Sequence, residues 1–407
     1  MLTEKISTSE SLRQNVAVRF TYDVHFTKDL FDVTNPLLSS VVGEGANKAK
    51  SILVAVDSGV LDRHPQLIDR INDYANHFVD EINLATQPIV IAGGEAAKND
   101  PALIEKIHFC IEQVGLCRHS YVLAIGGGAV VDMVGYAAAT AHRGIRLIRI
   151  PTTVLAQNDS GVGVKNGINA FGKKNFLGTF APPYAVLNDF NFLTSLSDRD
   201  WRAGIAEAVK VALIKDRTFF DFISSHAEKL AQRDGEAMEQ LIYRCCQLHL
   251  DHIASYGDPF EMGSSRPLDF GHWAAHKLEH ITDYRLRHGE AVAIGMALDC
   301  TYSYLTGLLS KKEWSQVIDT LRQLGFSLYV DELALDSECV ESKNSIFCGL
   351  TEFREHLGGE LAIMLLKQLG EGLEVNQVSI PIYRQAISML QEIEATTNGV
   401  ADLKYES

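Results

Sequence analysis

The sequence lacks long apolar segments, cysteine pairs with metal-site spacing, and an excess of positive charge. No stretch approaches the ~18 consecutive apolar residues that a transmembrane helix needs. The first 15 residues contain no apolar core of the kind found in secretory signals. These absences favour a cytoplasmic protein that does not insert into a membrane.

The seven cysteines form no CxxC pair, and an odd number cannot all pair within one chain. Reduced thiols are the simplest interpretation, with Cys245 and Cys246 packed on a helix. The formal net charge of −15 disfavours nucleic acid and anionic membranes as main partners. An anionic small molecule remains compatible with the sequence, because a local cluster of cations can override the global sign.

The composition that remains is that of a globular protein, with 46% hydrophobic and 22% charged residues. At roughly 150 residues per domain, a chain of 407 residues suggests two or three domains. No internal repeat or low-complexity tract interrupts it.

The first half of the chain alternates apolar strands with amphipathic helices. This alternation predicts a parallel sheet covered by helices on both faces. Apolar residues at every second position of 18–26 predict a further, half-buried strand. The remaining strands are expected at 51–57, 88–95, 121–128, 145–153 and 184–189, and the helices at 62–79, 99–116 and 129–142.

Helical periodicity dominates the second half, starting from a Ser/Asp capping signal near residue 197. Further helices are expected at 234–255, 270–282, 288–306, 311–324 and 382–396, with one short strand pair within 361–380. We therefore expect an α/β nucleotide-binding domain with a parallel sheet at 1–195 and a mostly helical domain at 196–407. The default functional site is the cleft between them.

Three glycines, Gly126 to Gly128, follow a predicted strand and open a predicted helix. Backbone N–H groups at such a helix start can face a pyrophosphate, although a plain tight turn has the same sequence. The GxGxxG fingerprint is absent. Asp57 ends an earlier strand, where an acid either accepts ribose hydroxyls or caps a helix. Thr152 and Thr153 end a third strand at the same edge.

A second group of residues has the chemistry of a metal site. His272 and His276 are four residues apart on one helix face, and His288 opens the next helix. Glu207 and Lys210 are three apart on another helix. Two imidazoles and one carboxylate with an open position suit a catalytic zinc, but spacing alone does not choose the ligands. Lys210 is either a surface charge or a substrate contact.

Residues 157–178 are rich in glycine, amides and lysine, and predict a long functional loop. Lys165, Lys174 and Asn175 are candidates to hold a phosphate, with Arg143 as a bidentate donor. The alternative interpretation is a mobile surface loop.

Together these segments resemble the dehydroquinate synthase family, the sugar phosphate cyclases. The resemblance runs from about residue 90 to 300 and continues more faintly at both ends. It is carried by an ordered series of motifs: "GGE" with Lys98, "GGG…D…G", "RG", "PTT", "QxDSxVGxK", "GKKNxxG", "AExxK", "GHxxxH" and "HGEAVxxGM".

The resemblance implies an NAD domain joined to a helical metal domain, in a homodimer. It implies zinc, with cobalt as an alternative, on Glu207, His272 and His288, and His276 as a residue that supports the ligands or relays a proton. The implied substrate contacts are Asp159, Lys165, Asn175 and Lys210, with Arg143 reaching the neighbouring subunit's site. The implied NAD contacts are Asp57, Glu95, Lys98, Gly127, Gly128, Asp132, Thr152, Thr153 and Lys174.

The chemistry implied by the resemblance is a redox loop without net consumption of cofactor. NAD+ takes a hydride from a zinc-held secondary alcohol, and the ketone acidifies the adjacent C–H so that phosphate leaves. NADH then returns the hydride, the ring opens, and an aldol addition closes the carbocycle. Zinc polarises the reacting oxygen, and lysines neutralise the phosphate.

The chain departs from the pattern of dehydroquinate synthase proper at cationic positions. His249 replaces a lysine, Ser265 replaces an arginine that is displaced to Arg266, Asp269 replaces an asparagine, and a late lysine has only Arg354 as a counterpart. A site with fewer cations favours a substrate without a carboxylate, because an unpaired buried charge costs several kcal/mol. Sedoheptulose 7-phosphate, used by valiolone-type cyclases, is such a substrate.

The segment around the metal-site histidines is not typical of those enzymes either. It is most similar to the dehydroquinate-synthase-like proteins of bacterial Ebo gene clusters. The alternatives are 3-dehydroquinate synthase proper, a metal-dependent polyol dehydrogenase of the glycerol type, which would release NADH, and a non-catalytic family member. The complete Glu/His/His set argues against the last of these.

Overall fold

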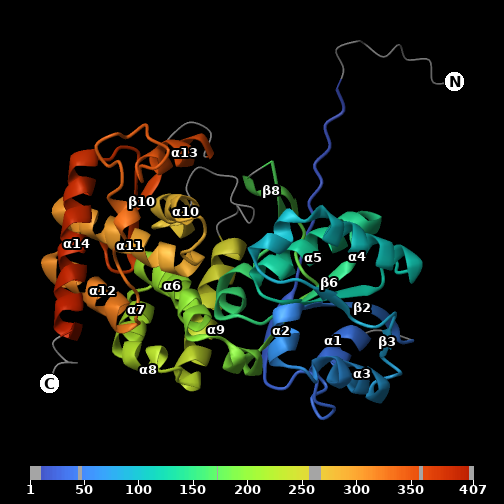
Figure 1. Cartoon of the computed structure of the whole chain (residues 1–407). Coiled ribbons are helices and arrows are strands. Elements are labelled where there is room, and N and C mark those ends of the chain that lie inside the picture. The colour runs from blue at the N-terminus through green and yellow to red at the C-terminus, as the bar shows by residue number, and fades with distance from the viewer. Residues whose placement is uncertain (1–10, 45–47, 172, 256–266, 357–360, 403–407) are drawn as a thin grey trace.

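The computed structural model describes residues 11–44, 48–171, 173–255, 267–356 and 361–402. It consists of an α/β part built on a parallel sheet and a C-terminal, mostly helical part beside it (Figure 1). The predicted fold class is therefore confirmed. Ser265 and Arg266, two of the positions at which the chain departs from the family pattern, lie outside the described residues.

The sheet has seven strands in the order β1-β9-β6-β5-β2-β3, and β4 also pairs with β2. Every pairing in this sheet is parallel. The bounds of its strands are β1 Asp23–Thr27, β2 Lys50–Asp57, β3 Ile82–Leu84, β4 Ile89–Ile91, β5 Tyr121–Gly126, β6 Arg146–Pro151 and β9 Ala185–Asp189.

Helices cover both faces of this sheet, as the alternating pattern predicted (Figure 1). Successive residues of β2 point to opposite faces: Ile52 and Val54 pack in the same core cluster as α3, while Leu53 packs with α4 and α5. The bounds of the helices are α1 Leu37–Gly43, α2 Ser58–Arg63, α3 Leu67–His77, α4 Pro101–Gln113 and α5 Gly128–Thr140.

The N-terminal strand is shorter than the sequence pattern predicted. Val18 and Phe20 are 66% and 62% exposed, and β1 begins only at Asp23. The reason is pairing, because Asp23 aligns with Ala185, the first residue of its partner β9. Upstream residues have no strand to pair with, and alternation alone does not stabilise an isolated strand.

The segment predicted as one long loop, 157–178, is largely regular. A single π-helical turn, η3 (Ala156–Ser160), is followed by an antiparallel hairpin of β7 (Lys165–Ala170) and β8 (Lys173–Phe180). Buried Arg149 in β6 holds the connection, donating to Gly161 O at 3.0 Å, Gly163 O at 2.7 Å and Lys165 O at 2.9 Å. These bonds satisfy backbone acceptors that a loop would otherwise expose to water.

The helical part begins with α6 (Asp198–Lys215), whose N-cap is Ser197, as predicted. Its centre is α11 (His288–Leu305), which contacts α6, α10, α12 and α14. Within the described residues its other elements are α7 Arg217–Ser225, α8 Ala227–Ala231, α9 Gly235–Ser255, α10 His272–Ile281, α12 Lys311–Gln323, α13 Cys348–His356, β10 Ile363–Gln368, β11 Glu371–Val375 and α14 Ile380–Asp402.

Three further expectations from the sequence concern the cysteines, membrane spans and the domain boundary. Cys245 and Cys246 are buried on α9, as expected, and all seven cysteines are free thiols. Among the residues described, no helix combines the length and hydrophobicity of a membrane span. The proposed domain boundary at 195/196 falls between η4 (Phe190–Ser195) and α6.

A buried carboxylate joins three helices of this part. Asp299 Oδ1 on α11 accepts hydrogen bonds from Trp273 Nε1 at 3.0 Å and from the Tyr383 hydroxyl at 2.8 Å, and its Oδ2 accepts from Gly271 N at 3.2 Å. Burial raises the pKa of Asp299 to about 7, against the lowering effect of these donors. An acid with a raised folded-state pKa loses stability as pH rises from its unfolded value through its folded one.

We therefore predict that Asp299→Asn removes a stability loss that the parent shows between pH 5.5 and 8.5. For a carboxyl pKa of about 7, this loss amounts to about 2 kcal/mol. Urea unfolding of both proteins at both pH values measures it. An equal difference between parent and variant at the two pH values would contradict the prediction.

Candidate functional site

The glycine turn lies where β5 ends and α5 begins. Gly127 is the N-cap of α5, and no side chain caps this helix. Its first N–H groups therefore have neither an intrahelical partner nor a side-chain cap. A Cβ added to Gly128 would lie 2.6 Å from Ser160 Oγ, so glycine keeps this space open between α5 and η3. The turn has the geometry of an anion-binding helix start.

Asp57 lies beside this turn, at the carboxyl end of β2. Its Oδ1 accepts from Gly59 N at 2.8 Å, so it does cap α2. Burial raises the pKa of Asp57, while the N–H groups of Gly59 and Gly127 oppose this rise. Thr152 N donates to Gly126 O at 3.0 Å. Asp57 thus caps a helix and also lies beside the glycine turn, so its role as a cap does not exclude a role in binding.

Thr153 has a local structural partner at this edge of the sheet, since its hydroxyl oxygen accepts from Ala156 N at 3.1 Å. It thereby helps to start η3, the turn that carries Asp159. The carboxyl ends of the parallel strands therefore gather the first group of predicted cofactor residues: Asp57, Gly127, Gly128, Thr152 and Thr153.

A second group of predicted cofactor and substrate residues links the hairpin to α5. Buried Lys98 donates to Asp132 Oδ2 at 2.9 Å and to Asn175 Oδ1. Asn169 Nδ2 donates to Glu95 Oε1 at 3.0 Å. Burial raises the pKa of Asp132 even though the Lys98 ammonium lowers it.

Three helices bring the predicted metal ligands together. Glu207 lies within α6, while His272 and His288 are the first residues of α10 and α11. Glu207 Oε1 is 3.6 Å from His272 Nε2 and 3.4 Å from His288 Nε2. The Glu207 side chain is 1% exposed, and its Oε1 accepts no hydrogen bond.

These separations fit a metal ion. Two ligand atoms at the zinc–nitrogen distance of about 2.1 Å, in tetrahedral geometry, lie about 3.4 Å apart. One ligand atom from each of Glu207, His272 and His288 lies within 4.8 Å of the others. His272 Nδ1 is 3.1 Å from Phe270 O. A carbonyl only accepts, so Nδ1 carries the hydrogen and Nε2 offers its lone pair to the site.

The charges of the site are strongly coupled. Burial alone would raise the pKa of Glu207, but Lys210, His288 and His272 hold it well below its usual range. Burial, followed by the Lys210 charge, lowers the pKa of His272 to about 3. Burial also disfavours protonated His288, yet the Glu207 and Glu279 carboxylates raise its pKa to about 9. Without a metal the site therefore attracts a proton to the place where a cation fits.

Lys210 lies one turn after Glu207 and pairs with Glu207 Oε2. Burial would lower the pKa of Lys210, but the carboxylates of Glu207, Asp159 and Asp269 raise it. Asp159 in turn lies 2.9 Å from His249 Nδ1. Burial alone would raise the pKa of Asp159, but His249 lowers it.

Three predicted site residues remain to be placed, of which His276 lies beside the proposed ligands and Arg143 lies far from them. His276 lies one turn after His272, with ring centroids 5.4 Å apart, and 6.0 Å from the His288 ring. Lys165 begins β7. Arg143 is exposed after the far end of α5, about 20 Å of helix from the glycine turn. Within one chain, Arg143 therefore does not join the other site residues.

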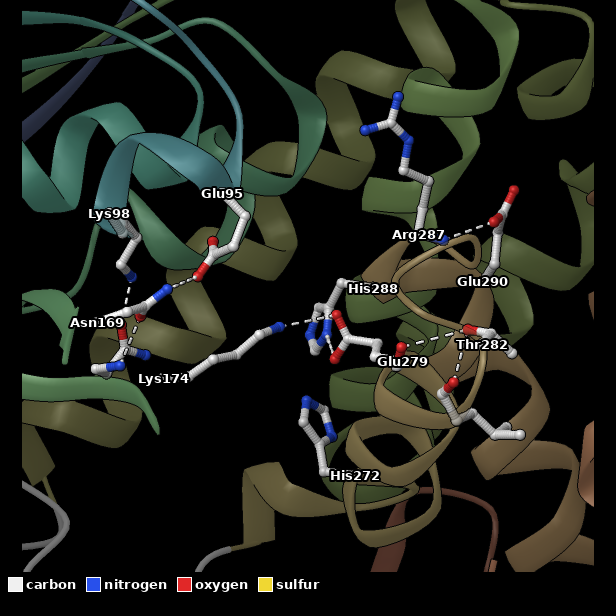
Figure 2. Close-up of polar contacts among 12 residues, drawn as sticks. Glu95, Lys98, Asn169, Lys174, His272, Glu279, Thr282, Arg287, His288 and Glu290 are labelled. Carbon is white, nitrogen blue, oxygen red and sulfur yellow. Dashed lines mark hydrogen bonds and ion pairs between the residues drawn. The ribbon is translucent and has the colours of Figure 1, made fainter. Parts of the chain in front are cut away.

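Lys174 contacts the metal side of the site. From β8 it reaches Glu279 on α10, with its Nζ 3.0 Å from Glu279 Oε1 (Figure 2). Glu279 Oε2 lies 3.2 Å from His288 Nδ1. Side chains from the sheet part and the helical part therefore meet here.

Glu279 and Arg149 are two residues of this region that the sequence analysis missed. Glu279 follows His272 by seven residues, two helical turns, so helical spacing could have placed it on the same face. Arg149 is a charge inside an apolar strand of a sheet covered on both faces, which is itself an unusual signal.

Comparison with known proteins identifies the family. Residues 88–203 match the family model described as 3-dehydroquinate synthase N-terminal, and residues 204–342 match the one described as 3-dehydroquinate synthase C-terminal. The border between the two matches falls within α6.

Named relatives agree with these matches. The chain is 36% identical over 292 residues to the 3-dehydroquinate synthase of Dichelobacter nodosus (strain VCS1703A), covering 72% of this chain and 76% of the relative. It is 35% identical over 309 residues to the 2-epi-5-epi-valiolone synthase of Streptomyces glaucescens, covering 76% of each.

A solved structure extends the likeness over most of the chain. The 2-epi-5-epi-valiolone synthase of Streptomyces hygroscopicus subsp. jinggangensis 5008, with NAD+ and Zn2+ bound, superposes with a TM-score of 0.82 at 29% identity. The match covers 94% of this chain and 99% of that one. From the two family-model matches and the relatives of more than 30% identity, we conclude that the chain belongs to the 3-dehydroquinate synthase family.

Proposed function

We propose that the protein is a sugar phosphate cyclase that uses NAD and a divalent metal, zinc or cobalt, to convert a seven-carbon sugar 7-phosphate into a carbocycle with loss of phosphate. The observation that carries the proposal is the environment of Glu207. Its buried Oε1 accepts no hydrogen bond and faces two imidazole nitrogens at 3.4 and 3.6 Å. A donor set of one carboxylate and two imidazoles, open on one side, suits a catalytic metal.

In this proposal Glu207, His272 and His288 hold the metal, and the glycine turn with Asp57 receives the dinucleotide. Bound NAD+ would supply the hydride acceptor and, once reduced, the donor, while the metal would supply a Lewis acid for the reacting oxygen. The other proposed cofactor contacts are Glu95, Lys98, Gly127, Gly128, Asp132, Thr152, Thr153 and Lys174.

Lys210 is proposed to bind substrate oxygens. Its side chain is 4% exposed, and its ammonium stays charged because the neighbouring carboxylates raise its pKa. A buried fixed cation stabilises negative charge that develops on the substrate more strongly than a hydrated one. Asp159, Lys165 and Asn175 complete the proposed substrate contacts.

His276 is proposed to hold or pass a proton. Its imidazole lies beside the rings of His272 and His288, and it is exposed whereas His272 is buried. It can therefore exchange protons with solvent while remaining next to the metal ligands.

Arg143 is proposed to act on the phosphate of a neighbouring subunit in a homodimer. Its exposed position beyond the far end of α5 supports this role better than one in its own chain's site.

The charges around Lys210 favour a substrate without a carboxylate. Three carboxylates, of Glu207, Asp159 and Asp269, act on this one ammonium, and His249 is already paired with Asp159. A substrate carboxylate would add a further negative charge with no free partner among these groups. The likeness to two 2-epi-5-epi-valiolone synthases is consistent with this preference.

The second candidate is 3-dehydroquinate synthase itself. It is supported by a relative of that name that is 36% identical over 72% of the chain. The difference between the two candidates is the presence of a carboxylate on the seven-carbon substrate, which makes them separable by direct assay.

We predict that Glu207→Ala and His272→Ala each abolish bound zinc and turnover, with zinc affinity falling more than about 100-fold. Metal analysis of the purified proteins measures this. The matched control is His280→Ala, an exposed histidine on the same helix α10, which should keep both. Full zinc content in both alanine variants would show that other groups hold the metal.

We further predict that the protein releases phosphate from sedoheptulose 7-phosphate without net formation of NADH. Offering this compound and the carboxylate-bearing heptulosonate 7-phosphate separately, with phosphate release, absorbance at the NADH band and product mass recorded, tests the proposal. Stoichiometric NADH without phosphate would instead identify a polyol dehydrogenase.

A third prediction concerns substrate choice. His249→Lys with Ser265→Arg should raise kcat/KM for the heptulosonate phosphate roughly tenfold, the effect of about 1.4 kcal/mol from added cations. His249→Gln, which removes the imidazole without adding a fixed cation, is the control and should show no gain. The substrate preference would be refuted if the parent already turned over the heptulosonate phosphate rapidly and the double variant had the same kcat/KM.

A further inference from the structure

Glu279 lies next to the proposed metal site without belonging to its three ligands. It comes two helical turns after His272 on α10, and its side chain is 6% exposed. Both carboxylate oxygens are engaged: Oε2 lies 3.2 Å from His288 Nδ1, and Oε1 lies 3.0 Å from Lys174 Nζ (Figure 2).

The contact with Glu279 determines which nitrogen of His288 is free. A carboxylate accepts hydrogen bonds, so His288 Nδ1 keeps its hydrogen, and Nε2 is the nitrogen that releases its proton and offers a lone pair when a metal binds. That Nε2 faces Glu207 Oε1 at 3.4 Å. A carboxylate that accepts a hydrogen bond from the other ring nitrogen of a metal-binding histidine fixes both the tautomer and the orientation of the ring.

The backbone that carries Glu279 is itself fixed. Glu279 O accepts from Tyr284 N at 2.8 Å and from the Thr282 hydroxyl at 3.3 Å. The same hydroxyl donates to Leu278 O at 2.7 Å. These bonds close the last turn of α10, so the carboxylate is presented from a rigid helix end.

Lys174 approaches from the other part of the molecule. It lies on β8, and the next residue, Asn175, is anchored there by its N–H to Asn169 Oδ1 at 2.9 Å and by its Oδ1 to Lys98. The Lys174 ammonium also lies 5.2 Å from the centroid of the Tyr284 ring. Its charge is therefore held at Glu279 from two sides.

We propose that Glu279 is a positioning residue for the metal ligand His288, and that Lys174 holds Glu279 in place so that the hairpin contributes to metal affinity. The inference rests on the proposed metal site of Glu207, His272 and His288. It assigns to the β7–β8 hairpin a role in the helical part of the molecule, in addition to its contacts within the sheet part.

Another arrangement uses Glu279 as a ligand. One ligand atom from each of His276, Glu279 and His288 also lies within 4.8 Å of the others. Two observations favour positioning. Both oxygens of Glu279 already have donors, whereas the buried Oε1 of Glu207 accepts no hydrogen bond.

The test measures metal binding by the full-length protein stripped of metal. Zn2+ affinity is determined by competition with a chromophoric chelator, and Co2+ loading is followed by its visible absorption, which reports ligand geometry. For Glu279→Gln we expect 10–100-fold weaker Zn2+ binding, an altered Co2+ spectrum, and still one metal per chain at saturation.

For Lys174→Met we expect a smaller loss of Zn2+ affinity, about three- to tenfold, because it removes only the support of Glu279. The double variant should bind about as weakly as Glu279→Gln alone, since coupled residues are not additive. Lys174 is 36% exposed on a hairpin, so this variant tests the proposal even if Glu279→Gln folds poorly.

Two neighbouring charges provide matched controls. Lys173→Met removes the same charge one residue away, where the ammonium lies 6.0 Å from the centroid of the Phe176 ring. Glu290→Gln removes a carboxylate from the first turn of α11 that pairs with Arg199. Both controls should bind Zn2+ with parental affinity.

Parental Zn2+ affinity and an unchanged Co2+ spectrum in Glu279→Gln would overturn the inference, and so would equal losses in the Lys174 and Lys173 variants. If Glu207→Ala loses metal while Glu279→Gln binds normally, the proposed function stands and the inference falls. If Glu279→Gln binds no metal at saturation while Glu207→Ala does, Glu279 is a ligand. The inference and the proposed ligand set of Glu207, His272 and His288 then both fail.

Discussion

The charge of Glu207 is the constraint around which the site is built. An isolated buried carboxylate costs several kcal/mol, so it must be matched by cations or donors held close to it. Lys210 supplies one charge from the next turn of α6, and His272 and His288 face the carboxylate from two other helices. Helices α6 and α10 both pack against α11, and this packing keeps these groups within a few ångströms of each other.

The sheet part and the helical part are joined by buried polar contacts as well as by apolar packing. Asn158 in the π-turn η3 donates to Gly204 O of α6 at 2.8 Å, three residues before Glu207. Gln157, in the same turn, donates to the carbonyl oxygens of Pro151 and Asp189 at strand ends. One turn thus ties the edge of the sheet to the helix of the carboxylate. With Lys174 and Glu279 it sets the relation between the proposed dinucleotide and metal sites.

Expectations based on periodicity succeeded for elements whose apolar residues recur at a regular spacing along the sequence. Most strands of the parallel sheet and helices α4, α5 and α9 to α12 were predicted, as was Ser197 as the cap of α6. The sequence analysis did not predict α1 and β3, and the one helix expected at 62–79 is divided into α2 and α3. The expectations failed where a partner decides the outcome. Val18 and Phe20 have the pattern of a strand but no neighbouring strand to pair with. Residues 157–178 were predicted to be a loop, but the strands β7 and β8 pair with each other, and Arg149 holds the start of β7.

The sequence alone determined the fold class, the family and the residue types of the site, because apolar periodicity and ordered motifs are properties of the chain itself. Which nitrogen of His288 faces Glu207, that Lys174 reaches Glu279, and that Arg143 stands apart from the other site residues were decided only by the tertiary structure. These facts depend on contacts between residues up to 105 positions apart. Such contacts arise when helices pack together and the β7–β8 hairpin meets α10, and no local pattern in the chain encodes them.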